Sequence, residues 1–181
     1  LPERLFTADK TIYLAPETFV SELEKVYDMF SVDTPAPEQT GFDLQLIGRR
    51  DPRTNNSWFH NSHRMVKGKD RCLALIHPQD AEHRQLSNGD MARVSSRVGS
   101  ISIQVAISDE MKPGVISIPH GWGHQLDGIR LGIAQQHAGV NTNILTDDRF
   151  LDSLSGNAAL NAVPVSVTKV TRQLQENQQA G

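Results

Sequence analysis

The 181-residue chain is poor in residues that build covalent or metal cross-links. Its single cysteine, Cys72, excludes an internal disulfide and a cysteine cluster for zinc or for iron and sulfur. No apolar run approaches the roughly 18 residues that a membrane-spanning helix needs, so no membrane segment is predicted. The formal net charge of −3 offers no overall attraction for nucleic acid. Any anion-binding site must therefore be local.

Sequence signatures of catalysis are also missing. No serine lies in a nucleophile elbow, and no glycine-rich loop of the P-loop type occurs. Asp147 and Asp148 are adjacent, which suits the capping of a helix start better than acid–base chemistry. Cys72 lies beside the apolar run 73–76, which predicts a buried structural thiol. The sequence therefore predicts no catalytic residue and favours a binding module over a complete enzyme.

What the chain does contain is a polar loop, residues 48–61, here called the Arg-rich loop. It gathers three arginines, three asparagines, a tryptophan and a histidine. Arginine pairs with phosphates and carboxylates, and asparagine amides bond to the edges of heterocycles. We therefore expect the loop to hold a large, polar, anionic organic molecule. The alternative is a solvated basic loop closed by an ion pair between Asp51 and an arginine.

From Gly41 onward, short apolar runs alternate with turn residues. Several runs have a period of two, which is typical of strands with one buried face. Strands are predicted at residues 42–47, 73–76, 91–96, 100–107, 115–118 and 163–170. Short helices are predicted at residues 78–83, 129–137 and 147–154. This density of short strands and turns predicts a mainly β protein, either a closed barrel or a sandwich.

Residues 1–40 are predicted to form a connector with an amphipathic helix. Pro16 and Glu17 suit a first helical turn. Apolar residues then recur at helical spacing and form a face that must pack on another surface, namely Phe19, Val20, Leu23, Val26, Tyr27 and Phe30. Two prolines mark residues 31–40 as a linker. The predicted division is a connector at 1–40, a folded domain at 41–172 and a flexible tail at 173–181.

Histidines raise the possibility of a metal site. His120 and His124 are four residues apart, but they lie in a glycine-rich loop, whereas such pairs bind metal on one face of a helix. His60 and His63 have the same weakness. We therefore predict no metal ligand, and we expect glycines such as Gly121 to let the backbone approach a ligand closely.

The Arg-rich loop is the first of an ordered series of motifs. The series consists of Gly48-Arg49-Arg50, Asn55-Asn56-Ser57-Trp58-Phe59-His60-Asn61, His77-Pro78-Gln79-Asp80-Ala81, Asn88-Gly89-Asp90, Lys112-Pro113-Gly114-Val115, Pro119-His120-Gly121-Trp122-Gly123-His124, Val140-Asn141-Thr142-Asn143-Ile144-Leu145-Thr146 and Leu154-Ser155-Gly156-Asn157-Ala158-Ala159-Leu160. Over residues 41–170 it resembles the C-terminal molybdopterin-dinucleotide-binding domain of the dimethyl sulfoxide reductase family, which includes formate dehydrogenases and nitrate reductases. Residues 13–17 are similar to the connector into that domain.

The resemblance implies a double-psi β-barrel with a few short helices, and it implies a ligand. That ligand is molybdopterin guanine dinucleotide, which carries molybdenum or tungsten in the holoenzyme. In this family the domain caps the cofactor, and the metal-ligating residue lies in an earlier part of the chain. The residues expected to bind the cofactor are Gly48, Arg49, Arg50, Asn56, Ser57, Trp58, His60, Asn61, His120, Gly121, Trp122, Asn141, Asn143 and Asn157.

Within this set, chemistry suggests three roles. The Gly48-Arg49-Arg50 turn offers donors for the pyrophosphate. Four amides suit the edges of the pterin and guanine, those of Asn56, Asn61, Asn141 and Asn157. Three rings suit packing on the heterocycles, those of Trp58, His60 and Trp122.

The expected partners are the remaining domains of the same oxidoreductase, so the chain alone is expected to be inactive. The type of the first loop favours a formate-dehydrogenase-like enzyme. Two alternatives stay open: a small cofactor-binding subunit that stands alone, and an unrelated double-psi barrel enzyme such as a small decarboxylase or half of an aspartic protease. The start of the chain, Leu1-Pro2-Glu3-Arg4, lacks an initiator methionine and an apolar signal segment. We therefore expect a fragment of a longer protein; its compartment is not fixed, although a cytoplasmic one is favoured.

Overall fold

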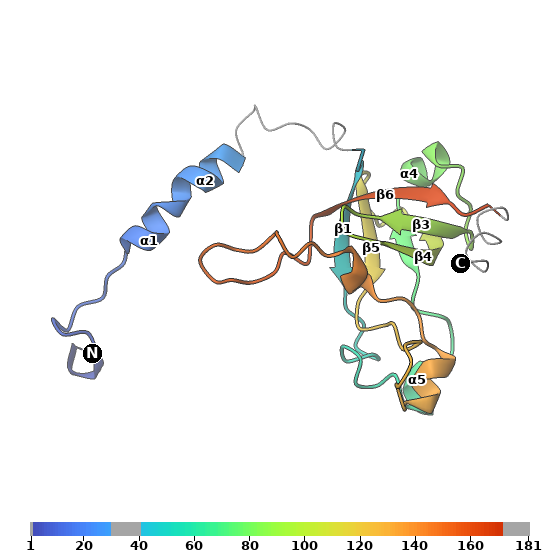
Figure 1. Cartoon of the computed structure of the whole chain (residues 1–181), viewed down its shortest axis with the longest axis horizontal. Coiled ribbons are helices and arrows are strands. Elements are labelled where there is room, and N and C mark those ends of the chain that lie inside the picture. The colour runs from blue at the N-terminus through green and yellow to red at the C-terminus, as the bar shows by residue number, and fades with distance from the viewer. Residues whose placement is uncertain (1, 30–40, 172–181) are drawn as a thin grey trace.

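The computed structural model describes residues 2–29 and 41–171. The predictions of a proline-containing linker at 31–40, of Phe30 on the helical face and of a tail at 173–181 fall outside the described residues. Six strands close into a barrel (Figure 1), one of the two arrangements that the apolar runs predict, and their ends lie within two residues of the predicted ones. They are β1 (Leu44–Arg49), β2 (Ala74–Ile76), β3 (Met91–Ser95), β4 (Ser100–Ile107), β5 (Val115–Pro119) and β6 (Val163–Lys169).

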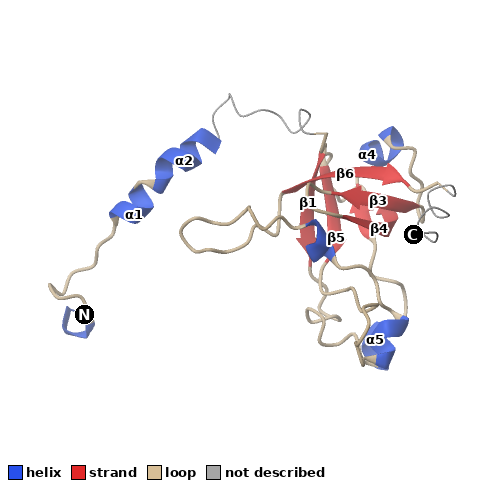
Figure 2. Ribbon diagram, viewed as in Figure 1, coloured by secondary structure: helices blue, strands red, loops and turns tan. Residues whose placement is uncertain are grey.

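The barrel has the strand order β1-β5-β2-β4-β3-β6. Two of its pairs are parallel, β1 with β5 and β2 with β4, and the remaining pairs are antiparallel. Because parallel neighbours cannot be joined by a tight hairpin, the chain must cross over between them. Two such parallel pairs in one closed, mainly β barrel are the arrangement of a double-psi β-barrel, so the predicted fold class is confirmed (Figure 2).

The barrel interior is filled by the buried faces of the strands. In β4, Ile101, Ile103 and Val105 are buried, whereas Gln104 is exposed. Full burial of one such aliphatic side chain stabilises a fold by about 1.5–3 kcal/mol. This packed interior makes the barrel a rigid support for the loops that leave its ends.

Short helices surround the barrel. The predicted helix at 78–83 is present as α4 (Pro78–His83), and α5 (Gly132–Gln136) lies within the predicted segment 129–137. Two short elements were not predicted, α3 (His63–Val66) and the 3-10 helix η3 (Thr142–Leu145). None of the helices in the described part of the chain combines the length and apolar character needed to cross a bilayer.

The predicted helix at 147–154 was wrong, as was the role of Asp147 and Asp148 as its cap. Asp147 is buried and forms an ion pair with Arg97, whose Nη2 lies 2.6 Å from Oδ1. The same carboxylate accepts the backbone N–H of Arg149. Hydrogen bonding from Arg97 lowers the pKa of Asp147 to about 2. The carboxylate therefore anchors a turn, and residues 147–162 continue as an extended arm closed by a bridge between Leu151 and Ala158.

The lead-in, residues 2–29, contains a 3-10 helix η1 (Pro2–Arg4) and two helices, α1 (Glu17–Val20) and α2 (Glu22–Met29). Its apolar side chains are exposed, with Phe19 at 60%, Leu23 at 63% and Tyr27 at 78% of full exposure. The arm extends from the barrel toward these helices (Figure 1), and Ser153 donates a hydrogen bond of 2.6 Å to Glu22. The apolar face predicted from the sequence is thus present and uncovered among the described residues.

Candidate functional site

A cavity of about 200 Å³ opens where β1 and β5 end. The parallel pairing of these strands brings Gly48 opposite Ile118 and Arg49 opposite Pro119, so the loops that follow both strands start at one rim. Four of the residues that line this cavity were predicted to bind the cofactor, and the others were not. Its lining consists of Leu46, Gly48, Arg50, Ile118, His120, Thr142, Asn143, Thr146, Leu160 and Asn161.

His120 lines this cavity and has a buried ring nitrogen without a partner in the described structure. That nitrogen is Nε2. Burial lowers the pKa of His120, and the positive charge of Arg50 lowers it further. The imidazole is therefore neutral near pH 7. A buried polar atom without a partner is costly, and in a residue that lines a cavity it suggests a ligand or water that satisfies it.

The histidine loop, residues 120–124, packs closely against two other loops because its glycines lack side chains. Gly121 has φ +89°, and a Cβ there would lie 2.4 Å from the carbonyl oxygen of Asn56. Gly123 has φ +108°, and a Cβ there would lie 2.6 Å from Cβ of Asn141. Only glycine combines such a φ with such an approach. In the described structure the close approach at Gly121 is to the Arg-rich loop, and the predicted approach to a ligand stays a prediction.

Asn56 lies in a strained part of the Arg-rich loop. Asn55 and Asn56 both have positive φ, 41° and 66°, a region that asparagine tolerates better than most residues. Ser57 is half-buried behind them, and its carbonyl accepts the backbone N–H of His60.

Behind the rim, His60 and Trp122 form a buried aromatic layer. Their ring centroids are 4.0 Å apart, and His60 Nδ1 lies 2.7 Å from His124 Nε2. Burial, with a smaller contribution from His124, lowers the pKa of His60 to about 4. His60 Nε2 and Trp122 Nε1 are buried and lack partners in the described residues. The two rings thus support the histidine loop, and their suggested packing on a heterocycle stays a prediction.

Arg49 faces the barrel wall. Its Nη1 donates to the carbonyl and hydroxyl of Ser117 at 3.1 and 3.3 Å, and its Nη2 donates to the carbonyl of Leu73 at 2.8 Å. These contacts tie the end of β1 to β5 and to the segment before β2. Arg50, by contrast, is exposed and lines the cavity. Of the two arginines, Arg50 is the one placed to meet an anion.

The structure places the asparagines predicted to bind the cofactor in different surroundings. Asn61 Oδ1 accepts the backbone N–H groups of Ile133 and Ala134 at the start of α5. Asn141 caps η3 by accepting the N–H of Asn143. Both amides therefore hold loop ends, whereas the side chain of Asn143 is exposed at the cavity.

Two further predicted residues lie away from the cavity lining. Trp58 is 79% exposed at the outside of the Arg-rich loop. Asn157 lies on the exposed arm, where its backbone carbonyl accepts the N–H of Asp152. No contact within the described structure joins either of them to His120.

Asn161 is the main cavity residue that the sequence did not reveal. Its Oδ1 accepts the backbone N–H of Gly48 at 2.8 Å. The signal was present in the sequence, because Asn161 directly follows the last motif and precedes β6. That position marks a site residue only because β6 pairs with β1, and this pairing is not visible as a local sequence pattern.

Metal-ligating groups are sparse. In residues 2–29 and 41–171, no three His, Cys, Asp or Glu side chains stand close enough to share a metal ion. Cys72 is buried, as predicted, and burial raises its pKa to about 11. The thiol accepts the backbone N–H of Val140 and serves packing.

Comparison with known proteins identifies this arrangement. Residues 44–164 match the model of the family described as Molydopterin dinucleotide binding domain. The chain is 30% identical over 119 residues to a tetrathionate reductase of Salmonella typhimurium, covering 56% of this chain and 12% of that protein. It is also 30% identical over 121 residues to a dimethyl sulfoxide reductase of Haemophilus influenzae, covering 67% of this chain and 14% of that protein.

The fold has a counterpart among solved structures. Acetylene hydratase from Pelobacter acetylenicus superposes with a TM-score of 0.61 at 20% sequence identity, covering 90% of this chain and 22% of that one. The chain thus corresponds to a small part of each of these proteins, and the resemblance inferred from its motifs is confirmed. The chain belongs to the molybdopterin-dinucleotide-binding domains of the dimethyl sulfoxide reductase family of molybdoenzymes.

Proposed function

We propose that the barrel holds the guanine dinucleotide form of molybdopterin at the cavity between β1, β5 and η3. The observation that carries this proposal is that Arg50, His120 and the exposed Asn143 line one cavity, and that Nε2 of His120 is buried without a hydrogen-bond partner in the described residues. A cofactor of this family is anionic and rich in hydrogen-bonding groups. A cation, a neutral imidazole and an amide suit such a ligand.

In this proposal the residues bind and orient the cofactor. Arg50 contributes positive charge at the rim, while Leu46, Ile118 and Leu160 form an apolar wall. The carbonyl-bound guanidinium of Arg49 keeps that rim in place. When bound, the cofactor supplies the metal centre and its redox chemistry, for which the barrel provides a support.

We further propose that the residue ligating the metal lies outside this barrel. The thiol of Cys72 is buried and its pKa is raised, so it stays protonated near pH 7. A metal-bound cysteine must instead be a thiolate. Cys72 is therefore not proposed as the metal ligand, and in this proposal catalysis requires the rest of the enzyme.

The rest of the same oxidoreductase is the proposed partner. The relatives named above are roughly seven to eight times longer than the segment they share with this chain. The lead-in places large apolar side chains in solvent, among them Phe6, Leu14 and Tyr27. Helices this short are marginal on their own and depend on packing. We propose that the lead-in and the arm pack on the preceding domains, which would cover these side chains.

In this proposal the other domains of the enzyme determine which substrate is bound. The relatives are named for tetrathionate and for dimethyl sulfoxide. The formate-dehydrogenase-like character suggested by the first loop stays a prediction, which the activity of the full-length enzyme on formate would test.

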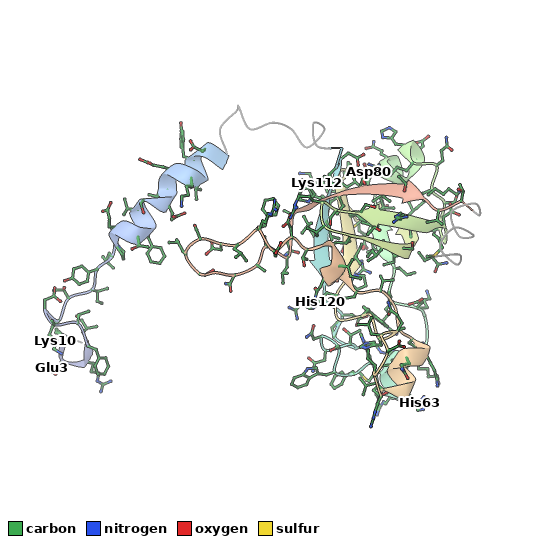
Figure 3. All side chains as sticks on the ribbon, in the orientation of Figure 1. Glu3, Lys10, His63, Asp80, Lys112 and His120 are labelled. Atoms are coloured by element: carbon green, nitrogen blue, oxygen red, sulfur yellow. The ribbon has the colours of Figure 1, made fainter. Side chains whose placement is uncertain are left out.

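The cofactor proposal is tested in the full-length enzyme that carries this chain, expressed with its cofactor. Arg50→Ala and His120→Ala are compared with wild type for molybdenum and for guanosine monophosphate released by acid hydrolysis. We expect both variants to lose cofactor about ten- to a hundredfold faster on warming, since one charge-assisted contact is worth roughly 1.5–3 kcal/mol. Lys112→Ala is the matched control, because Lys112 lies at the opposite end of the barrel from His120 (Figure 3). Wild-type retention in both variants would refute the proposal.

A further inference from the structure

Asn161 is the cavity residue whose hydrogen-bonding direction is set by the protein itself. The backbone N–H of Gly48 can only donate, so the side-chain atom 2.8 Å away must be the acceptor Oδ1. That bond uses one of the two lone pairs of Oδ1 and fixes the orientation of the amide, so its two N–H donors are the larger part of what it can offer a ligand. Asn161 also lines the cavity beside Arg50 and His120. Its contribution to a ligand is therefore that of a donor.

The backbone supports this placement. The contact between Gly48 and Asn161 joins residues 113 positions apart and ties the end of β1 to the segment before β6. Immediately afterwards, Ala162 has φ +58°, a left-handed conformation that costs a residue with a side chain about 1–2 kcal/mol. Observed strain of this kind suggests a site where position matters more than local stability. The turn at Ala162 leads from the arm into β6 with Asn161 facing β1.

The other residues that line the cavity indicate which part of the ligand Asn161 contacts. Arg50 brings a positive charge, and no Asp or Glu is among the lining residues described for this cavity. A guanine or pterin edge presents N–H groups that call for acceptors, usually a carboxylate. Phosphate oxygens only accept and carry negative charge, so donors and a cation suit them. The cavity is thus better matched to the phosphate part of the ligand than to its ring edges.

We propose that the side-chain amide of Asn161 donates to the phosphate oxygens of the bound dinucleotide and so fixes the pyrophosphate at this rim. This inference rests on the proposed function. Under this inference Asn161 and Arg50 bind the pyrophosphate, a role that the sequence suggested for the turn at residues 48–50.

The test uses Asn161→Asp in the full-length, cofactor-loaded enzyme. The aspartate keeps an oxygen that accepts from Gly48, but it replaces the donor with a negative charge. Asn88→Asp is a matched control, since Asn88 Oδ1 also accepts a backbone N–H, that of Ile107 at 2.6 Å. Ile107 pairs with Ile76, which pairs with Ile116 near the start of β5, so Asn88 lies away from the cavity rim. The readouts are the rate of guanosine monophosphate loss at a fixed temperature and the thermal unfolding midpoint.

We expect Asn161→Asp to release cofactor ten- to a hundredfold faster, on the order of a lost charge-assisted contact, while Asn88→Asp releases it at the wild-type rate. Repulsion of phosphate is screened by salt, so the excess rate should shrink between about 0.05 and about 0.5 M salt even if the unfolding midpoint also falls. A wild-type release rate, or an excess independent of salt, would overturn the inference. If Arg50→Ala and His120→Ala still release cofactor faster, the proposed function stands without Asn161; if neither does, the proposed function fails as well.

Discussion

Arg49 and Arg50 are adjacent, yet the structure predicts opposite consequences for their replacement by alanine. Arg49 is half-buried and donates three hydrogen bonds to barrel groups of Ser117 and Leu73. Arg50 is exposed at the cavity. Arg49→Ala is therefore expected to reduce the stability of the barrel, and Arg50→Ala is expected to weaken cofactor binding with little effect on stability.

The size of the Arg49 effect follows from its contacts. A hydrogen bond from a charged donor contributes about 1.5–3 kcal/mol when buried, and partial exposure of the guanidinium reduces this. For the shared donor to Ser117 and the donor to Leu73 together, we expect a loss of about 2–3 kcal/mol. In a domain of this size, 1 kcal/mol shifts the unfolding midpoint by roughly 3–4 °C. The midpoint of Arg49→Ala should thus fall by about 6–12 °C, whereas exposed surface changes stay within about 0.5 kcal/mol.

The assay is thermal unfolding of the 181-residue chain, followed by far-ultraviolet circular dichroism for wild type and both variants. Arg49→Lys serves as an intermediate, because it keeps the charge but not the planar fork that bonds β5 and the segment before β2 at once. Its midpoint should lie between those of wild type and Arg49→Ala. A wild-type midpoint for Arg49→Ala, together with a loss of cofactor in the full-length enzyme, would refute the scaffold role and restore the pyrophosphate role.

Two further perturbations test the packing of the loops. Burial lowers the pKa of His60 from 6.5 to about 4, so the unfolded chain binds more protons than the folded one in this window. The unfolding midpoint should fall as pH decreases from 6.5 toward 4, and His60→Gln should flatten that dependence; a flat wild-type profile would contradict the burial of a neutral imidazole. Gly121→Ala combines a positive φ with a Cβ 2.4 Å from the Asn56 oxygen, so denaturant unfolding should show a loss of about 3 kcal/mol or more. Gly156→Ala has φ +71° but an open surrounding, and it should lose only about 1–2 kcal/mol.

Much of the barrel could be predicted from the sequence because its strands carry a strong local signal. The alternation of Ile101, Ile103 and Val105 marks β4 whatever its neighbours are. The segment 147–154 shows that a local sequence pattern can predict the wrong structure. Its two aspartates suit a helix start locally, but an ion pair between the exposed Arg97 and the buried Asp147 overrides the preference. That contact spans 50 residues and is not visible as a local pattern.

The candidate site was predictable as a set of loops but not as a set of contacts. Residue type suggested that Arg49, Asn61 and Asn141 would bind a ligand; in the structure all three bond to the protein, and their contact with a ligand stays a prediction. Amides and guanidinium groups satisfy backbone donors and acceptors as readily as they satisfy ligands. Only geometry separates the two uses, and it does so here for Arg50 and Asn143, which remain at the cavity.

The rim itself is a consequence of strand direction. Because β1 and β5 run parallel, their carboxyl ends meet, and the Arg-rich loop and the histidine loop leave the barrel side by side. Because β6 runs antiparallel to β1, with Val163 opposite Leu46, the start of β6 lies at that same end. Asn161 precedes β6 by two residues and therefore reaches the rim without belonging to either loop. A cofactor site in such a barrel should thus be sought not only after β1 and β5 but also immediately before the strand that runs antiparallel to them.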